Sequence, residues 1–508
     1  MKKQTRIDEA TRLKEVVSQL KQYKQENILD VYFPEVGKYC RSAYPKHMAF
    51  FEAGAKFDVR AFIAANRVGK TFAGVLELVF HLTGLYPYWW KGKRFKNPVI
   101  AWCASVTPAQ MKSAVQAVMF GERQKGTGLL PKKHYINEQG EFRTWNMAGV
   151  PNVVGTVEVQ WHNADGEPQG FSKCEFKTYE QGADKFQGAR VDVIMLDEEP
   201  KDYSIFTECI TRTGGDNDSE EELARGTGIL YGTFTPLSGY SDMVLSFLPD
   251  GMLPPNGVHP DKPWVKVVNA GWDDVPHLSE EWKARRLAEY PLHERDARTK
   301  GIPTKGSGAI YPYPEDMITI APFRMPNWWP RVFGLDVGYD HPTAALWAAI
   351  DPESDTMYLY SEHYLRQSEI SIHASAIKAR GAWIPGVIDP SASHKRSEFE
   401  TTLEMYDREG IILSPANNAV EPGIAEVQQR IATGRLKVFD NLLNFFAEYR
   451  IYRRDENGKI VKKKDDLMDA MRYLCLSGTA VAVIKPDPMA EYRTESVYGN
   501  NYDPITGY

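Results

Sequence analysis

Cysteine is scarce in this chain of 508 residues, which carries Cys40, Cys103, Cys174, Cys209 and Cys475 with no C-x-x-C pair among them. An odd, dispersed set of thiols argues against a zinc site and favours a reducing compartment. Long apolar runs are absent too, since none approaches the roughly 18 residues that a membrane-spanning helix needs. No apolar segment follows the basic N-terminus, so we do not expect a secretory signal.

Neither sign of charge dominates, because 61 Lys and Arg residues stand against 67 Asp and Glu residues and leave a formal net charge of -6. A nucleic-acid partner would therefore need a local basic face. The sequence shows no short repeat and no long low-complexity segment. Its length allows two or three domains of ordinary size.

A phosphate-binding loop is the strongest pattern in the first half of the chain. Apolar residues Val59, Ala61, Phe62 and Ile63 indicate a short buried strand over residues 59–63. Residues 64–71 follow the spacing G-x-x-x-x-G-K-[ST], with Ala64 in place of the first glycine. Apolar residues at helical spacing come next. The backbone N–H groups of such a loop favour an anion. We expect Lys70 to reach the β- and γ-phosphates of a nucleotide and the Thr71 hydroxyl to hold Mg²⁺.

A second strong pattern is an apolar strand over residues 191–197 that ends in adjacent carboxylates. Ligands of α/β folds bind at the carboxyl edge of a parallel sheet, where these acids would lie. Asp197 fits the acid that holds Mg²⁺ in phosphate-loop ATPases, and Glu198 is the natural base for the attacking water. Arg67, inside the loop, can stabilise transition-state charge in cis.

Three further segments have more than one interpretation. Residues 228–236 run from a strand into a turn where Thr233 and Thr235 could sense the γ-phosphate, or could form a plain polar loop exit. Residues 44–51 could contact an adenine ring, or could form a helix turn packed on the core. Residues 7–29 predict an amphipathic helix, which could be a lid or a docking helix on the domain that follows.

A change of composition over residues 277–330 indicates a domain boundary. A charged helix is predicted first, and a Gly-, Pro- and Ser-rich stretch follows it. The predicted organisation is a helical segment (1–45), a phosphate-loop ATPase domain (46–310), a linker (311–330), a nuclease domain (331–484) and a flexible tail (485–508).

Acidic residues on separate elements define the second half of the chain. Asp336 lies in a predicted strand, Asp389 ends another, and Asp466 and Asp469 share one face of the last helix. Because an isolated buried charge is costly, this set suggests a shared cation, and oxygen ligands select Mg²⁺ or Mn²⁺. Two such ions about 4 Å apart could hold the attacking and leaving oxygens of a phosphodiester. The alternative makes each acid a cap or a salt-bridge partner.

The order of the elements adds to this interpretation. Three strands, a helix, a strand and a final acidic helix are the order of a ribonuclease-H-like nuclease. Lys and Arg residues of segment 449–464, with an Asn-Gly hairpin signal, suit a phosphate backbone or form a solvated charged hairpin.

An ATPase followed by such a nuclease is a narrow combination, and residues 40–480 resemble the large subunit of the terminase of tailed double-stranded-DNA bacteriophages. The resemblance implies an α/β fold with an N-terminal P-loop (RecA/ASCE-like) ATPase domain on a mostly parallel sheet and a C-terminal RNase H-like nuclease domain. The matching residues are 65–71, 196–198, 232–236, 335–338, 388–389 and 466–473.

The resemblance implies a DNA-packaging motor in the host cytoplasm. A ring of subunits on the portal protein of a procapsid would hydrolyse ATP to drive double-stranded DNA inward, with a monomer as the alternative state in solution. The nuclease would cut concatemeric DNA, and a small terminase subunit would select it. No membrane partner is implied.

The resemblance also implies roles for single residues. ATP and Mg²⁺ would be bound by Asn66, Arg67, Gly69, Lys70, Thr71 and Asp197. Catalysis would use Glu198 and Arg67 in one site and Asp336, Asp389 and Asp469 in the other, where Asp466 completes the metal ligands. This chain departs from the family pattern at Ala64, at Asn66 where many members carry the loop arginine, and at His47 where an adenine-reading glutamine is expected.

Two alternative functions remain open from the sequence. One is a DNA repair or helicase-like ATPase-nuclease, although the second half shows acids where a second motor lobe would need its own arginine motif. The other is an ATPase whose C-terminal domain is an inactive docking module.

Overall fold

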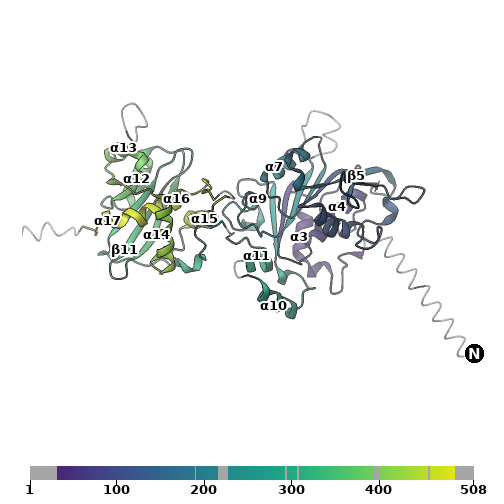
Figure 1. The fold of residues 1–508 in the computed structure, drawn as a ribbon, viewed down its shortest axis with the longest axis horizontal. Coiled ribbons are helices and arrows are strands. Elements are labelled where there is room, and N and C mark those ends of the chain that lie inside the picture. The colour runs from purple at the N-terminus through teal and green to yellow at the C-terminus, as the bar shows by residue number, and fades with distance from the viewer. Residues whose placement is uncertain are drawn as a thin grey trace, which may run out of the picture. The chain divides into compact units, whose positions relative to one another are not determined.

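The computed structural model describes residues 16 and 31–486, except 189, 215–226, 292–293, 306–307, 394–400 and 456–457. The chain divides into two compact units, residues 1–306 and 307–508, and each is built on its own sheet (Figure 1). The helix predicted over 7–29, apart from residue 16, and the tail beyond residue 486 lie outside the described residues. Among the described helices, none has both the length and the apolar character needed to cross a membrane.

The sheet of the first unit has eight strands in the order β3-β4-β5-β2-β6-β7-β1-β8. Neighbouring strands in the part β5-β2-β6-β7-β1-β8 are parallel. Strands β4 and β3 continue the sheet beyond β5 in antiparallel pairing. The strands are β1 (Val59–Ala64), β2 (Ile100–Ser105), β3 (Thr144–Asn146), β4 (Val154–His162), β5 (Pro168–Thr178), β6 (Val193–Asp197), β7 (Ile229–Phe234) and β8 (Val265–Ala270). The strands predicted over residues 59–63 and 191–197 and within 228–236 are therefore confirmed.

Every residue of β1 is buried, as expected for a parallel strand covered on both faces. Helix α4 packs against β4, β5, β6 and β7 and supplies much of the apolar core on its side of the sheet. The helices of this unit are α3 (Pro45–Ala53), α4 (Lys70–Thr83), α5 (Pro108–Gln110), α6 (Ala117–Phe120), α7 (Tyr203–Thr213), α9 (Asp242–Phe247), α10 (Glu280–Glu289) and α11 (Arg295–Lys300).

The second unit has a mixed sheet of seven strands in the order β14-β13-β10-β11-β12-β15-β9. Its antiparallel centre, β10-β11-β12, is the predicted meander, and the outer pairs are parallel. The strands are β9 (Thr319–Ile320), β10 (Arg331–Asp336), β11 (Thr343–Asp351), β12 (Thr356–Leu365), β13 (Gly386–Ile388), β14 (Leu413–Pro415) and β15 (Leu436–Phe439). The helices are α12 (Ile370–Gly381), α13 (Thr402–Arg408), α14 (Val420–Ala432), α15 (Leu443–Ile451), α16 (Asp466–Tyr473) and α17 (Thr479–Val481).

Alternation along the central strands gives this second sheet two apolar faces. Val332 and Leu346 join the core formed with α14, α15 and α16, whereas Phe333, Leu335 and Trp347 join a second core with α12 and α13. Helices cover both faces, and Figure 1 shows them in the green and yellow part of the chain.

Two predicted segments differ in the structure. Residues 311–330, expected as a linker, contain β9, which pairs with β15, because Ile318 and its neighbours find apolar partners at that sheet edge. The basic segment 449–464 begins inside α15, and a single antiparallel bridge between Arg454 and Ile460 represents the hairpin among the described residues.

A fully buried ion pair ties β1 to α4 in the first unit. Arg60 Nη2 lies 2.6 Å from Glu77 Oε1, and Arg60 Nη1 donates a hydrogen bond of 2.8 Å to the carbonyl of Phe50. His81 Nε2 adds a contact of 3.3 Å to the same carboxylate. The pair offsets the cost of two buried charges as long as both partners are present.

We predict that Glu77→Ala destabilises the first unit by about 3–5 kcal/mol, because it leaves the Arg60 guanidinium buried without its counter-charge. Amide hydrogen exchange in β1 and α4 measures this unit alone. Glu280→Ala, at an exposed acid of α10 that pairs with Lys283, is the control and should change exchange little. Equal protection in Glu77→Ala and wild-type chains would contradict the prediction.

Candidate active sites

The phosphate loop connects β1 to α4 and is held from several sides. Gly69 has φ of 91°, a left-handed conformation that suits glycine and lets the chain enter α4. The Trp272 indole donates to the carbonyl of Asn66 at 2.9 Å, and His47 Nε2 lies 3.0 Å from the carbonyl of Val68. Asn66, Arg67, Gly69, Lys70 and Thr71 line a cavity of about 820 Å³ with residues of α10 and the turn before it.

The carboxylates of β6 reach this loop because of strand order. Strand β7 lies between β1 and β6, and its Thr233 pairs in register with Asp197. The Thr71 and Thr233 hydroxyls donate to Asp197 Oδ1 at 2.8 and 2.9 Å. Lys70 Nζ lies 3.2 Å from Glu198 Oε1, and Glu198 has a left-handed backbone with φ of 61°. The sheet thus brings together the loop and both acids.

Burial, and then the charge of Glu198, raise the pKa of Asp197 to about 6, although Thr71 and Lys70 act in the opposite direction. Because burial disfavours the ionised form of this carboxylate, a nearby cation would stabilise that form. The Thr71 hydroxyl and the Asp197 carboxylate are oxygen donors of the kind Mg²⁺ prefers, so this pair fits the ion.

Residues after β7 contact both the loop and the acid. The Thr235 hydroxyl donates to the carbonyl of Ala64 at 2.8 Å and to Asn66 Oδ1 at 3.1 Å. The Thr235 backbone N–H donates to Glu198 Oε2 at 3.3 Å. This segment is therefore more than a solvent-facing loop exit, since it joins two parts of the site.

An apolar cavity of about 480 Å³ adjoins the loop at Val68 and Gly69. Tyr44 and His277 contribute to its lining with their rings stacked at 5.9 Å. His47 lines it too, but burial lowers the pKa of His47 to about 4, and the ring is engaged by the loop carbonyl. Residues 44–51 include most of the packed helix α3, and Tyr44 and His47 also line this cavity, while contact with an adenine ring stays a prediction.

The acids of the second unit converge at the ends of two neighbouring strands. Leu335 of β10 pairs with Ile388 of β13, so Asp336 and Asp389 follow at adjacent positions of the sheet edge. Asp336 is the last residue of β10, where the sequence placed it inside the strand. Asp336, Asp389, Asp466 and Asp469 all line one cavity of about 750 Å³.

Helix α16 approaches β10 closely at Gly334. A Cβ atom added there would lie 2.4 Å from the carbonyl oxygen of Ala470, so any larger residue would push the helix away. The buried Glu448 carboxylate accepts the N–H groups of Leu467 and Met468 at 2.7 and 3.3 Å and fixes the first turn of α16. The glycine and this cap position the helix that carries Asp466 and Asp469.

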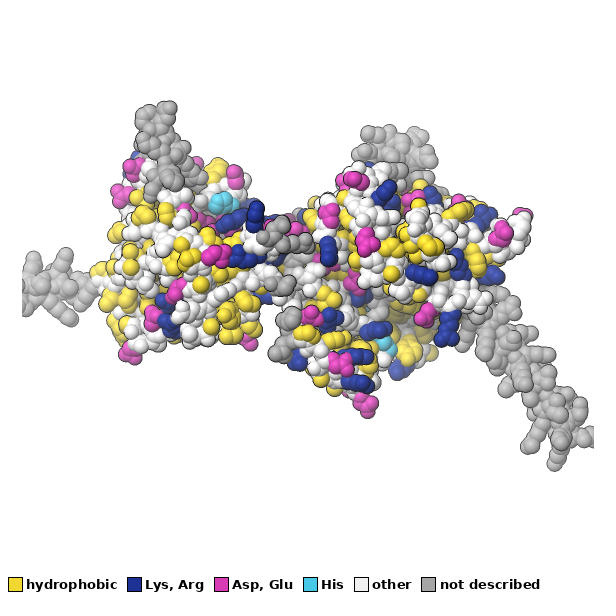
Figure 2. All heavy atoms as spheres, viewed as in Figure 1, with side chains coloured by type: hydrophobic (Ala, Val, Ile, Leu, Met, Phe, Trp, Pro, Cys, Tyr) yellow, Lys and Arg dark blue, Asp and Glu magenta, His cyan; other side chains and the backbone are white. Residues whose placement is uncertain are grey.

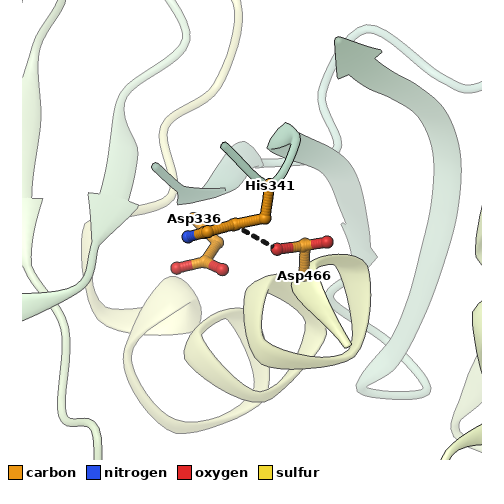
Figure 3. Close-up of side chains that lie close together, drawn as sticks. All are labelled: Asp336, His341 and Asp466. Atoms are coloured by element: carbon orange, nitrogen blue, oxygen red, sulfur yellow. Dashed lines mark hydrogen bonds and ion pairs between the residues drawn. The ribbon is translucent and has the colours of Figure 1, made fainter. Parts of the chain in front are cut away.

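A histidine joins these acids. Asp336, His341 and Asp466 offer ligand atoms within 4.8 Å of one another, and Figure 3 shows the three side chains turned toward a common point. His341 Nδ1 lies 2.6 Å from Asp466 Oδ1. His341 is not among the ligands predicted from the sequence, although its place in the turn between β10 and β11, soon after Asp336, is a signal for it.

The other two acids have partners of their own. Lys462 Nζ and Arg472 Nη2 lie 3.1 and 2.9 Å from the two oxygens of Asp469. Asp389 accepts hydrogen bonds of 2.6 Å from the Tyr473 hydroxyl and from the Ser391 N–H. Although burial acts in the other direction, these bonds lower the pKa of Asp389.

Burial and the mutual repulsion of carboxylates together determine the electrostatics of this cavity. Burial, and then the charges of Asp469, Asp466 and Asp389, raise the pKa of Asp336 well above its ordinary range. A divalent cation would relieve that repulsion, and the carboxylate oxygens gathered here are ligands that Mn²⁺ or Mg²⁺ accepts. The residues present therefore fit a metal.

Comparisons with known proteins agree across both units. A family model described as "Terminase large subunit, T4likevirus-type, N-terminal" matches residues 61–316, and one described as "Terminase RNaseH-like domain" matches residues 333–477. The terminase large subunit of Salmonella phage P22 is 34% identical over 500 residues, which cover 92% of this chain and 91% of that protein. The terminase large subunit of Enterobacteria phage LP7 is 37% identical over 288 residues, 53% of this chain and 54% of that protein.

Among solved structures, the nuclease domain of the P22 large terminase is 32% identical and covers 36% of this chain and 97% of its own, with a TM-score of 0.33. The family assignment comes from the matches of sequence over both units. On those matches, the chain belongs to the terminase large subunits of tailed double-stranded-DNA bacteriophages, with an ATPase domain followed by an RNase H-like domain.

Proposed function

We propose that this chain is an ATP-driven motor that translocates double-stranded viral DNA into a procapsid and cuts concatemeric DNA with a metal-dependent endonuclease. Two observations together carry the proposal. In the first unit Lys70 pairs with Glu198 and Thr71 with Asp197, and in the second unit four carboxylates line one cavity. Family membership supports both activities.

In the first unit, Thr71 and Asp197 would hold Mg²⁺, which when bound neutralises charge on the phosphates. Lys70 Nζ pairs with Glu198 Oε1 at 3.2 Å. When the phosphates take over Lys70, Glu198 is released to orient the attacking water and accept its proton. Arg67, exposed in the loop at the cavity, is placed to meet charge that develops on the γ-phosphate.

Coupling of hydrolysis to movement would start at Thr235, which contacts Glu198, Asn66 and the end of β1. A change at Glu198 or in the loop therefore alters the hydrogen bonds at the start of the chain segment that follows β7. The aromatic cavity beside Val68 would receive the base, with Tyr44 and His277 offering ring faces.

In the second unit, Asp336, Asp389, Asp466 and Asp469 would hold two divalent ions, and His341 is a further ligand candidate. When bound, the ions supply stabilisation of the attacking and leaving oxygens of the phosphodiester. The chain itself orients the ligands: Tyr473 holds Asp389, and Arg472 and Lys462 hold Asp469.

The partners that follow are double-stranded DNA, a small terminase subunit that selects it, and the portal protein on which a ring of subunits would act in the host cytoplasm. Charged side chains of both signs are interspersed with apolar ones over the face in Figure 2, so DNA would be recognised by local basic groups. One such group, Lys462, Lys463 and Lys464, lines the nuclease cavity.

The proposal is tested by incubating the purified chain with plasmid, with and without ATP and Mn²⁺, and scoring phosphate release and DNA cleavage separately. We expect each activity to need its own unit. A chain that hydrolyses ATP and never cuts DNA under any metal condition would favour the docking-module alternative.

We predict that Glu198→Ala retains nucleotide binding and lowers ATP hydrolysis by about 10²–10⁴-fold, because the base is removed and the phosphate contacts remain. Equilibrium binding of a fluorescent nucleotide and phosphate release measure the two effects. Glu180→Ala, at an exposed acid of the same unit, should behave as wild type. Normal turnover in Glu198→Ala would remove Glu198 as the base.

We predict that Asp389→Ala abolishes metal-dependent plasmid cleavage and leaves ATP hydrolysis within about two-fold of wild type, since the residue lies in the separate second unit. Asp407→Ala, at an exposed acid on α13, is the control. Cleavage that survives in Asp389→Ala would exclude the carboxylate cavity as the cutting site.

We predict that Lys462→Gln, Lys463→Gln and Lys464→Gln together weaken DNA binding and flatten its dependence on salt by up to about 0.9 in slope per lysine. Fluorescence anisotropy without divalent metal measures binding free of cleavage. Lys378→Gln, at an exposed lysine of α12, is expected to leave the slope unchanged. If the salt dependence of DNA binding is unchanged in the triple variant, segment 449–464 is a solvated charged segment that does not contact DNA.

A further inference from the structure

A second cavity of about 820 Å³ lies in the first unit at the C-terminal end of α4. Gly84, directly after α4, and His162, the last residue of β4, belong to its lining. Lys70 starts α4, whose fourteen residues span about 20 Å at about 1.5 Å per residue. The cavity is therefore separate from the nucleotide site, at the other end of the same helix.

The floor of this cavity, defined by His134 and Trp161, carries polar atoms without partners. His134 and Trp161 are 5% and 2% exposed, and neither His134 Nε2 nor Trp161 Nε1 has a hydrogen-bond partner among the described residues. Buried polar groups are ordinarily satisfied, and an indole N–H can act only as a donor. The ring of His162 packs edge-on against His134 at 4.9 Å and is itself occupied, with Nδ1 at 3.2 Å from the carbonyl of Thr83.

The rim of the cavity, defined by Arg94, Lys96 and Lys133, is basic. Arg94 lies over the Tyr86 ring at 5.1 Å, which holds its guanidinium at the edge of the cavity. Lys96 and Lys133 are exposed. The lining also includes the carboxylate of Asp165, on an exposed turn, so the balance of charge at the rim is positive.

We propose that this cavity binds a phosphate group, supplied either by a polynucleotide backbone or by a free phosphate anion. A phosphate offers several acceptor oxygens, which match the three cationic side chains at the rim. The two ring nitrogens at the floor are covered by the protein and would add donors once their side chains turn toward the cavity. A single carboxylate would satisfy fewer of these donors. The polynucleotide source rests on the proposed function, and the free-anion source does not.

The protonation state of the floor agrees with this division of roles. Burial, and then the charges of His162 and Lys133, lower the pKa of His134 to about 3. The imidazole is therefore neutral near pH 7 and can donate a hydrogen bond through Nε2, while Arg94, Lys96 and Lys133 supply the charge.

The test compares Lys96→Gln/Lys133→Gln in the full chain with a control of equal charge, Lys91→Gln/Lys112→Gln. The control lysines are exposed in the same unit and are absent from the cavity's described lining. Binding of duplex DNA is followed by anisotropy over a range of salt without metal. Inorganic phosphate is titrated calorimetrically in a Lys70→Ala background, which weakens binding at the nucleotide site.

Three results are decisive. A salt slope for DNA that falls by about 1.8, with no change in the control, supports the cavity and identifies the polynucleotide as the source. An unchanged slope with at least a ten-fold loss of phosphate affinity supports a free anion. If neither quantity changes, the cavity does not bind phosphate and the proposal is wrong.

Trp161→Phe provides a second, independent readout. It keeps an aromatic ring at the floor and removes the N–H donor, so phosphate affinity should fall about ten-fold, as expected for one hydrogen bond to a charged group. ATP hydrolysis without DNA should equal wild type in this variant and in the lysine variant, which shows that the unit is folded. Retained phosphate affinity in Trp161→Phe would contradict the role of the floor. A wild-type chain without ATPase and cleavage activity would instead count against the proposed function alone.

Discussion

Both candidate sites depend on one constraint, which is that carboxylates at the end of a central strand must be compensated by positive charge. Asp197 and Asp336 each follow an apolar strand, and burial raises the pKa of both. An uncompensated charge in such a place is costly. The chain supplies positive charge to the neighbouring acids, with Lys70 at Glu198 and with Lys462 and Arg472 at Asp469, and a divalent ion would supply the remainder.

The two sheets position these acids through different strand arrangements. In the first unit all strands around the site are parallel, so the loop after β1, the acids after β6 and Thr235 after β7 emerge at one edge. In the second unit the parallel neighbours β10 and β13 bring two acids together, and a helix supplies the rest. One site is therefore fixed by loops on a sheet, and the other by the packing of a helix onto a sheet.

The sequence predicts most of the fold because the central strands and α4 have strong periodicity and clear boundaries. It also predicts the elements that carry Lys70, Asp197 and Asp389. Sequence spacing alone could not predict β9, which has two residues in a Pro- and Trp-rich stretch and forms through pairing with a strand far along the chain. His341 was missed because a single histidine in a turn has no periodic signal.

Long-range partners are the other part that the sequence cannot supply. The bond from His47 to the phosphate loop, and the ion pairs of Lys462 and Arg472 with Asp469, depend on how separate elements meet. The same holds for Glu448, which caps α16 from α15. Charge and residue type make such contacts possible, and the tertiary arrangement selects which of them form.

The contact between Gly334 and the backbone of α16 has a consequence for how these enzymes diverge. The distance between the acids of the second unit depends on Gly334, because this residue has no side chain and lets α16 pack closely against β10. Any substitution at Gly334 would push α16 away from β10 and so widen the space between Asp336 and Asp466, without changing either acid.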